Sequence, residues 1–201
     1  MKKILSLFAV VLCCLALNLQ AKEEPIVLAL WDTIQWPAEQ CDLRGLRLEV
    51  YGKVDNHVGL TLGIANATLG DTKGATFGFA NLNEGEFRGF QWGFFNDTQK
   101  DFYGWQSSWI GIAQKDICGL QDGLFVYDGG TVKGAQIAFV TAAQAAKGVQ
   151  FGLCNFTYDM TGLQFGVVNY TEQMNGVQIG LVNIIRNSKV PVFPFVNFYF
   201  N

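Results

Sequence analysis

The sequence contains few of the residues from which catalytic and metal sites are built. Its single histidine, His57, excludes a cluster of histidines around a metal ion, and a Ser-His-Asp triad would have to use this one side chain. No serine lies in a Gly-x-Ser-x-Gly motif, and no two cysteines have Cys-x-x-Cys spacing. We interpret His57 as a surface turn residue, and we expect no enzymatic activity, no cofactor and no metal site.

Charged residues and helix-forming segments are also scarce. Lys and Arg total 14 and Asp and Glu total 17, and the basic residues are scattered, which excludes a nucleic-acid partner. Beyond the first 21 residues, only Thr141 to Lys147 has a helix-forming composition. Without helices to cover a sheet, we expect an all-β fold whose apolar face is hidden by curling of the sheet or by lipid.

The amino terminus has the pattern of a secretory signal peptide. Lys2 and Lys3 precede an apolar run from Ile4 to Leu17, and the segment ends at the small residue Ala21. The run is too short to act as a membrane-spanning helix. We therefore expect a signal peptide at residues 1–21 and a single β-repeat domain at residues 22–201. The predicted location is the outer membrane or cell surface, with a periplasmic or secreted protein as the alternative.

Three cysteines, Cys41, Cys118 and Cys154, lie in the predicted domain. Because their number is odd, at least one has no disulfide partner within the chain. Cys154 takes a repeat position that Val168 and Val182 fill elsewhere, which favours a small apolar packing role.

Glycine is abundant, with 23 residues, and it marks a repeat. Eleven copies of the pattern Gly-apolar-Gln-apolar-Gly-apolar-apolar-Asn follow one another from Gly45 to Asn197 at spacings of 14 or 15 residues. The alternation predicts strands with two different faces. One face is apolar, as in Val149, Phe151 and Leu153, and the other is narrow and carries glycine and glutamine. The glutamines are Gln91, Gln106, Gln121, Gln136, Gln150, Gln164 and Gln178.

Two architectures can use such strands. In the favoured one, an added strand from Pro25 to Trp31 and the eleven repeats form an antiparallel meander that closes into a barrel of about twelve strands, with the apolar face against membrane lipid and the glutamines in the lumen. The repeat motif is almost the same whether it is read forwards or backwards along the chain, so two copies can pair antiparallel with glutamine near glutamine. The alternative is a parallel β-solenoid with coils of 14–15 residues, in which the apolar triplets stack inside and the glutamines form an outer ladder.

Three tryptophans form the candidate contact patch. Trp92, Trp105 and Trp109 lie on neighbouring strands, where they could pack in the core or against lipid, form an interfacial girdle, or stack on a sugar. Asp122 is the one carboxylate that we place on the apolar face. The asparagines of four Asn-x-Thr sequences are interpreted as strand-end residues that bond a turn, rather than as glycosylation sites. They are Asn66, Asn96, Asn155 and Asn169.

The repeat blocks, the lead-in Pro25–Trp31, the segment Leu43–Lys53 and the closing segment Val190–Asn197 resemble the bacterial surface-repeat proteins first noticed among leptospiral surface lipoproteins. The resemblance implies export and a cell-envelope location, and no reaction. This chain lacks a convincing lipid-attachment cysteine, because Leu12 rather than a small residue precedes Cys13. The favoured function is a non-enzymatic outer-membrane barrel of structural or narrow-passage role. The alternative is an exported solenoid that acts as a surface binding or adhesion module, with an envelope protein or a glycan as its partner.

Overall fold

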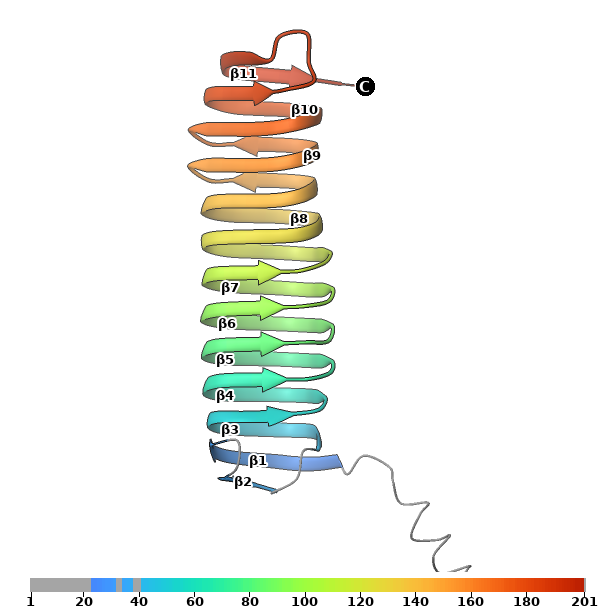
Figure 1. The fold of residues 1–201 in the computed structure, drawn as a ribbon, viewed down its shortest axis with the longest axis vertical. Helices are drawn as coiled ribbons and strands as arrows, with labels where there is room; N and C mark the ends of the chain where they lie inside the picture. The colour runs from blue at the N-terminus through green and yellow to red at the C-terminus, as the bar shows by residue number, and fades with distance from the viewer. Residues whose placement is uncertain (1–22, 32–33, 38–40, 201) are drawn as a thin grey trace, which may run out of the picture.

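The computed structural model describes residues 23–31, 34–37 and 41–200, and these residues form strands and turns without any helix. The signal peptide expected at residues 1–21 lies outside the described residues. Figure 1 shows a rod of stacked coils. Its strands are β1 (Glu23–Trp31), β2 (Ile34–Trp36), β3 (Asp42–Val54), β4 (His57–Thr68), β5 (Thr72–Asn83), β6 (Phe87–Thr98), β7 (Phe102–Ala113), β8 (Ile117–Phe151), β9 (Cys154–Phe165), β10 (Val168–Ile185) and β11 (Val192–Tyr199).

The coils pair in parallel and in register along the chain. Gly74 of β5 lies beside Gly59 of β4 and Gly89 of β6, and β9 and β10 match residue for residue in the same way. Only the terminal strands β2 and β11 pair antiparallel, with β1 and β10 respectively. The protein is therefore a parallel β-solenoid of about 10 turns, and the favoured antiparallel barrel is wrong. The strand expected at Pro25–Trp31 is confirmed as β1, but it pairs in parallel with β3.

One glycine in each coil explains why the chain can stack so closely. Ten glycines have φ between 128° and 154°, a region that favours glycine over every other residue. A Cβ atom at Gly104 would overlap the carbonyl oxygen of Gly89 in the preceding coil, and the same conflict recurs through the series. The repeat glycine is thus required by close backbone contact between coils.

The orientation of the two faces is the reverse of the one expected for a solenoid. All seven glutamines are at most 1% exposed, whereas the neighbouring apolar residues Trp92, Ile137 and Phe151 are 45–53% exposed. The glutamine face therefore fills the interior, and the apolar triplets lie outside. The segment Thr141 to Lys147 belongs to β8, so its predicted helix-forming tendency is overridden by the stack.

Two amide ladders run through this interior. Each glutamine Nε2 donates to the Oε1 of the glutamine one coil earlier, at 2.7–3.0 Å, from Gln178 back to Gln91. The asparagines bond in the opposite direction in two runs, Asn66 to Asn96 and Asn155 to Asn183, in which each Nδ2 donates to the Oδ1 one coil later, as from Asn66 to Asn81 at 2.6 Å. Gly111 and Val126 take the same position in the coils between these runs. A parallel in-register stack can satisfy these amides at every step, since equivalent side chains recur at the coil spacing of about 4.8 Å. The near-symmetry of the motif therefore does not decide the pairing direction.

Asn155 and Asn169 are the second residues of β9 and β10 and so lie near strand ends as expected, whereas Asn66 and Asn96 lie inside β4 and β6. None of the four points into a turn. Asn66, Asn96, Asn155 and Asn169 are at most 3% exposed, and the Nδ2 of each also donates to a backbone carbonyl of the following coil. Buried in this way, they cannot serve as glycosylation acceptors in the folded protein.

Candidate functional site

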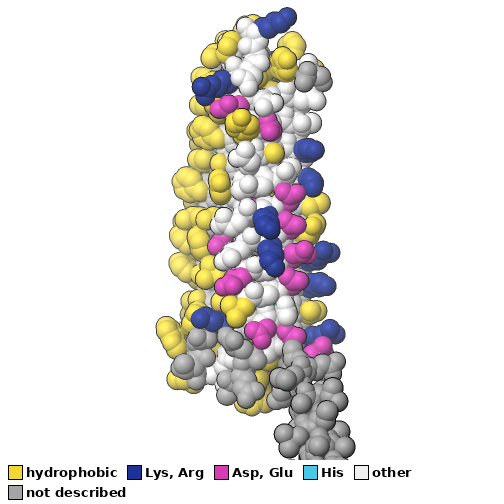
Figure 2. All heavy atoms as spheres, turned by 45° about the vertical axis from the view of Figure 1, so that its right-hand side comes forward, with side chains coloured by type: hydrophobic (Ala, Val, Ile, Leu, Met, Phe, Trp, Pro, Cys, Tyr) yellow, Lys and Arg dark blue, Asp and Glu magenta, His cyan; other side chains and the backbone are white. Residues whose placement is uncertain are grey.

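Each coil has three outward regions, which are defined here on residues 72–86. Face A is the outward side of residues 73–79 and their counterparts, and face B is the outward side of residues 80–83. The charged edge is the turn at residues 84–86 and 69–71. Figure 2 shows the charged side chains as a band along the rod, with apolar side chains gathered beside it.

Acidic side chains on the charged edge help to build the turns. Asp71 Oδ1 accepts from the backbone N–H of Glu86 at 2.9 Å, and Asp116 Oδ1 accepts from that of Thr131 at 2.9 Å. Asp101 makes the equivalent bond to the N–H of Asp116 at 3.3 Å. Each of these carboxylates thus links its own turn to the turn of the next coil, along the charged edge.

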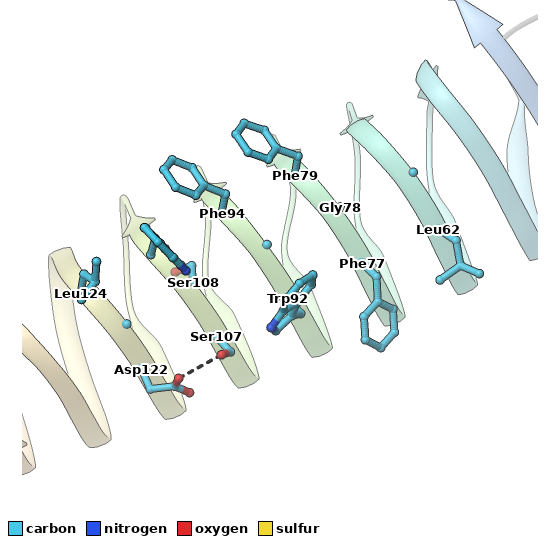
Figure 3. A pocket seen from close by; sticks show the side chains of 14 residues that line it. Leu62, Phe77, Gly78, Phe79, Trp92, Phe94, Ser107, Ser108, Asp122 and Leu124 are labelled. Carbon is cyan, nitrogen blue, oxygen red and sulfur yellow. Dashed lines mark hydrogen bonds between the residues drawn. The ribbon is translucent and has the colours of Figure 1, made fainter.

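Face A carries a groove between two rows of apolar side chains. One wall contains Leu62, Phe77 and Trp92, and the other contains Phe79, Phe94 and Trp109. Its volume is about 900 Å³, and the backbone of small residues such as Gly78 and Gly93 lies between the walls (Figure 3). A second section of about 440 Å³ continues from Gly123 to Val167. Because both sections include Gly123, the groove follows the rod across most of its coils.

The structure separates the three tryptophans of the candidate contact patch. Trp92 and Trp109 are 53% and 59% exposed and stand on opposite walls of the groove. Trp105 lies one row further from the groove, where its ring is 5.0 Å from that of Phe90. Neighbouring rings cover one another, as in Phe79 and Phe94, whose planes are parallel within 2° at 4.8 Å. The ring of Trp109 is tilted by 33° against Phe94, and that of Trp105 is nearly perpendicular to Phe90 at 69°.

Asp122 lies on face A, as its repeat position predicts. It is half-buried, and its carboxylate accepts from Trp105 Nε1 and from Ser107 Oγ, the latter at 2.9 Å (Figure 3). These two donors offset part of the cost of placing a carboxylate among apolar neighbours.

The seven glutamines have no access to a partner. They form the interior ladder, so a role as a surface ladder or a lumen lining does not fit their position. The second interior row, which includes Phe87, Phe102 and Ile117, is also inward, as its sequence position predicts.

Sequence reasoning missed several buried ionisable groups. His57 is fully buried and its Nδ1 lies 3.2 Å from Thr61 Oγ1, so the expected surface turn position is wrong. Burial, together with the charge of Arg47, lowers the pKa of His57 to about 4. The burial of His57 could have been inferred from the repeat register, because His57 lies 15 residues before Thr72, which also points inward.

Arg47 and Glu49 form a buried ion pair in the first coils, where Arg47 takes the position of the ladder glutamines. Arg47 Nε lies 2.7 Å from Glu49 Oε2, and its guanidinium also donates to the carbonyl of Ala67 at 3.0 Å. Burial raises the pKa of Glu49 to about 7, although the charge of Arg47 opposes the shift. Glycines at positions 52 and 63 leave the room that the Glu49 side chain occupies.

Asp128 is a second unexpected interior carboxyl group. It is fully buried, and its Oδ2 accepts from Gln136 Nε2 at 2.5 Å. Burial raises its pKa well above the ordinary value of 3.8. The group is therefore neutral over a wider pH range than a surface aspartate.

Nothing in the described part of the chain assembles a reaction centre. Within it, no three His, Cys, Asp or Glu side chains lie together in a way that could hold a metal ion. Ser107 bonds Asp122 and Ser188 bonds the carbonyl of Val190, while His57 is enclosed in the interior. Of the three cysteines in the described residues, Cys41 is buried, Cys118 is exposed and Cys154 is half-buried. Cys154 is therefore a partly exposed residue of face B rather than a core packer.

No helix in the described ranges has the length and apolar content needed to cross a bilayer. No protein family, characterised protein or solved structure that was compared with this chain matches it. The function must therefore be argued from the surface of the rod itself.

Proposed function

We propose that this protein is an exported, non-enzymatic binding module that docks its partner on the apolar groove of face A. The observation that carries the proposal is the extent of this apolar surface. Solvent-exposed Leu, Ile, Val, Phe and Trp side chains recur on successive coils, and the two groove sections join at Gly123. Exposed apolar patches of this length exceed what a soluble monomer ordinarily carries, and they mark interaction sites.

The rigidity of the scaffold supports the same function. Backbone pairing and two amide ladders fix the positions of the groove walls, so the surface is preorganised before a partner arrives. A solenoid offers an extended surface on which one contact is repeated in every coil. The narrow interior filled by glutamine leaves no lumen, so a passage role is not proposed.

Export rests on the signal-peptide pattern at residues 1–21, and a cell-envelope location follows from it. Amino-terminal sequencing of the protein recovered from its native cells tests this part of the proposal. We expect the mature chain to begin at Lys22, and an intact Met1 in the cell interior would contradict export.

Retention on an octyl resin tests the groove. We expect the wild-type chain to be retained at moderate salt, and Trp92→Gln/Trp109→Gln to elute earlier because both groove walls lose an exposed indole. The matched control is Tyr127→Gln/Phe156→Gln, which removes two aromatic side chains of similar exposure from face B. Equal losses of retention for both pairs would contradict a docking site on face A.

A further inference from the structure

The charges of the rod are segregated with respect to face A. The outermost row of this face contains five basic side chains, each exposed and each at the repeat position of Lys73. They are Arg44, Lys73, Arg88, Lys133 and Lys147. Across residues 44–181, the only carboxylate on face A is Asp122, although the whole chain has a net charge of −3. Face A is therefore locally cationic on an acidic protein.

The acidic residues that pair with this row lie next to it, on the charged edge. Arg88 pairs with Glu86 at 3.0 Å and Lys133 with Asp116 at 3.3 Å. Lys73 and Lys147 form no ion pair within the described residues, and both point outward beside the apolar rows. In the coils of Lys73 and Arg88, the order is thus acidic turn, basic row and apolar rows.

This order has the chemistry of an interfacial membrane surface. Apolar side chains with Trp and Phe enter the boundary between headgroups and acyl chains, while Lys and Arg beside them meet lipid phosphates. The acidic turns adjoin the basic row, through the Arg88–Glu86 and Lys133–Asp116 pairs, and would lie in water at the margin of the docked face. A neutral apolar partner would use the groove but would leave the basic row without a counterpart.

We infer that face A docks on the surface of an anionic lipid bilayer, with the apolar rows at the acyl boundary and the basic row at the phosphates. The inference rests on the proposed function, because it uses the same groove, and it adds the identity of the partner. Lys73 and Lys147, which form no ion pair within the described residues, provide the preference for anionic over neutral lipid. Trp92 and Trp109 carry the apolar contact.

Asp122 opposes this docking, since it places a carboxylate in the middle of the face. Its bonds to Trp105 and Ser107 reduce the cost of burying it without removing its charge. Asp122→Asn keeps the shape of the side chain and removes the charge. We expect this variant to bind anionic vesicles at least about threefold more tightly, since a like charge near the surface is removed.

Vesicle sedimentation tests the inference on the full chain, so that residues 1–21 contribute equally to every variant. The probes are vesicles of phosphatidylglycerol mixed with phosphatidylcholine and vesicles of phosphatidylcholine alone. We expect Lys73→Gln/Lys147→Gln to weaken binding to the anionic vesicles by about 30-fold, since each surface lysine contributes roughly 1 kcal/mol near such a membrane. Binding to the neutral vesicles should not change.

The matched control is Lys100→Gln/Lys115→Gln, which makes the same change of net charge on the charged edge. We expect it to weaken binding by less than about threefold, because those side chains stand away from the bilayer. Equal effects of the two lysine pairs would overturn the inference, as would the absence of binding to anionic vesicles. A dimer in light scattering that Trp92→Gln/Trp109→Gln dissociates would also overturn it, by making a second copy the occupant of face A. In each of these cases, octyl retention through the groove would leave the proposed function standing.

Discussion

The interior and face A of this solenoid are built by alternate residues of the same strands, yet they depend on opposite physics. Inside, the ladder glutamines hydrogen-bond to the glutamine one coil away, as Gln121 Nε2 donates to Gln106 Oε1 at 2.8 Å. Outside, Leu120 and its counterparts stack without enclosure and remain partly in contact with water. Stability therefore comes from the inward side of each strand, with its bonded amides and its buried apolar row, and the capacity to bind comes from the outward apolar side.

Two aspartates six residues apart show the same contrast. Asp122 is half-buried on face A, where Trp105 and Ser107 donate to its carboxylate. Asp128 is enclosed in the interior beside Gln136, and burial raises its pKa well above 3.8. Burial thus favours the neutral form of the carboxyl group at Asp128, whereas Asp122 on the outer face keeps partial contact with water.

The largest expected effect comes from breaking the close contact of coils in the interior. Gly104→Val would place side-chain atoms on the carbonyl of Gly89 and force a β-branched residue to adopt φ of 135°. We expect a loss of about 4 kcal/mol or more in the free energy of unfolding, measured by urea denaturation. On face A, Trp105→Val should cost far less, since that side chain is 47% exposed. A folded Gly104→Val variant of ordinary stability would contradict the stacking contact.

Adjacent substitutions at Leu120 and Gln121 sharpen the contrast between the two sides. Gln121→Leu leaves Gln106 Oε1 without its donor and removes the acceptor that Gln136 Nε2 uses. We expect a loss of about 2–4 kcal/mol, because two buried polar groups lose a partner. Leu120→Gln, by contrast, should cost less than about 1 kcal/mol in the same urea titration. A larger cost for Leu120→Gln would mean that the apolar side holds the fold together.

Asp128→Asn should stabilise the protein at pH 7, by about 1 kcal/mol or more, because it removes a buried carboxyl group that must stay neutral. The folded state binds the Asp128 proton more tightly than the unfolded chain does, so the wild-type protein loses stability as the pH rises above about 3.8. Denaturation at several pH values should show the advantage of the variant growing from pH 4 to pH 7. An advantage of Asp128→Asn that is constant with pH would argue against a raised pKa.

The pKa of His57 provides a probe with almost no perturbation of the structure. Burial lowers this pKa to about 4 from the ordinary 6.5, so stability from the neutral imidazole is present above pH 6.5 and is lost as the pH falls toward 4. We expect the NMR signals of the ring to remain those of the neutral form at pH 5.5. Titration near pH 6.5 would place His57 in water, as a surface turn residue.

Much of the fold could be predicted from the sequence, because the period and the alternation are explicit in it. The repeat of 14 or 15 residues, the strand at Pro25–Trp31 and the shared face of Phe87 and Phe102 all follow from counting residues. These features depend only on the fixed periodicity of a β-strand.

The direction of pairing and the choice of the inner face could not be predicted in the same way. A motif that is nearly the same in both directions permits either pairing, and general hydrophobicity places Phe151 and Leu153 inside. The stack reverses that preference, because its inward positions are taken by the repeat glycine, the bonded amides and a second buried row that contains Phe87 and Phe102, which leaves no inward place for the apolar triplets. Gly148 and Gln150 are therefore inside, and their apolar neighbours are outside.

The candidate site was predictable only in part. The clustering of Trp92 and Trp109 is evident in the sequence, but the groove between them depends on which rows face outward. The interior positions of His57 and Asp128 follow from register with Thr72 and Ala113, which becomes informative only after the parallel stack is known.

Labelling of two neighbouring engineered cysteines tests the reversed faces most directly. Ala138 is 8% exposed on the side of the glutamines, and Phe139 is 56% exposed on face A. In a background in which all five native cysteines are replaced, we expect Phe139→Cys to react with a water-soluble maleimide in the folded protein, and Ala138→Cys to react only after unfolding in urea. Rapid labelling of Ala138→Cys together with protection of Phe139→Cys would show that the apolar residues form the core.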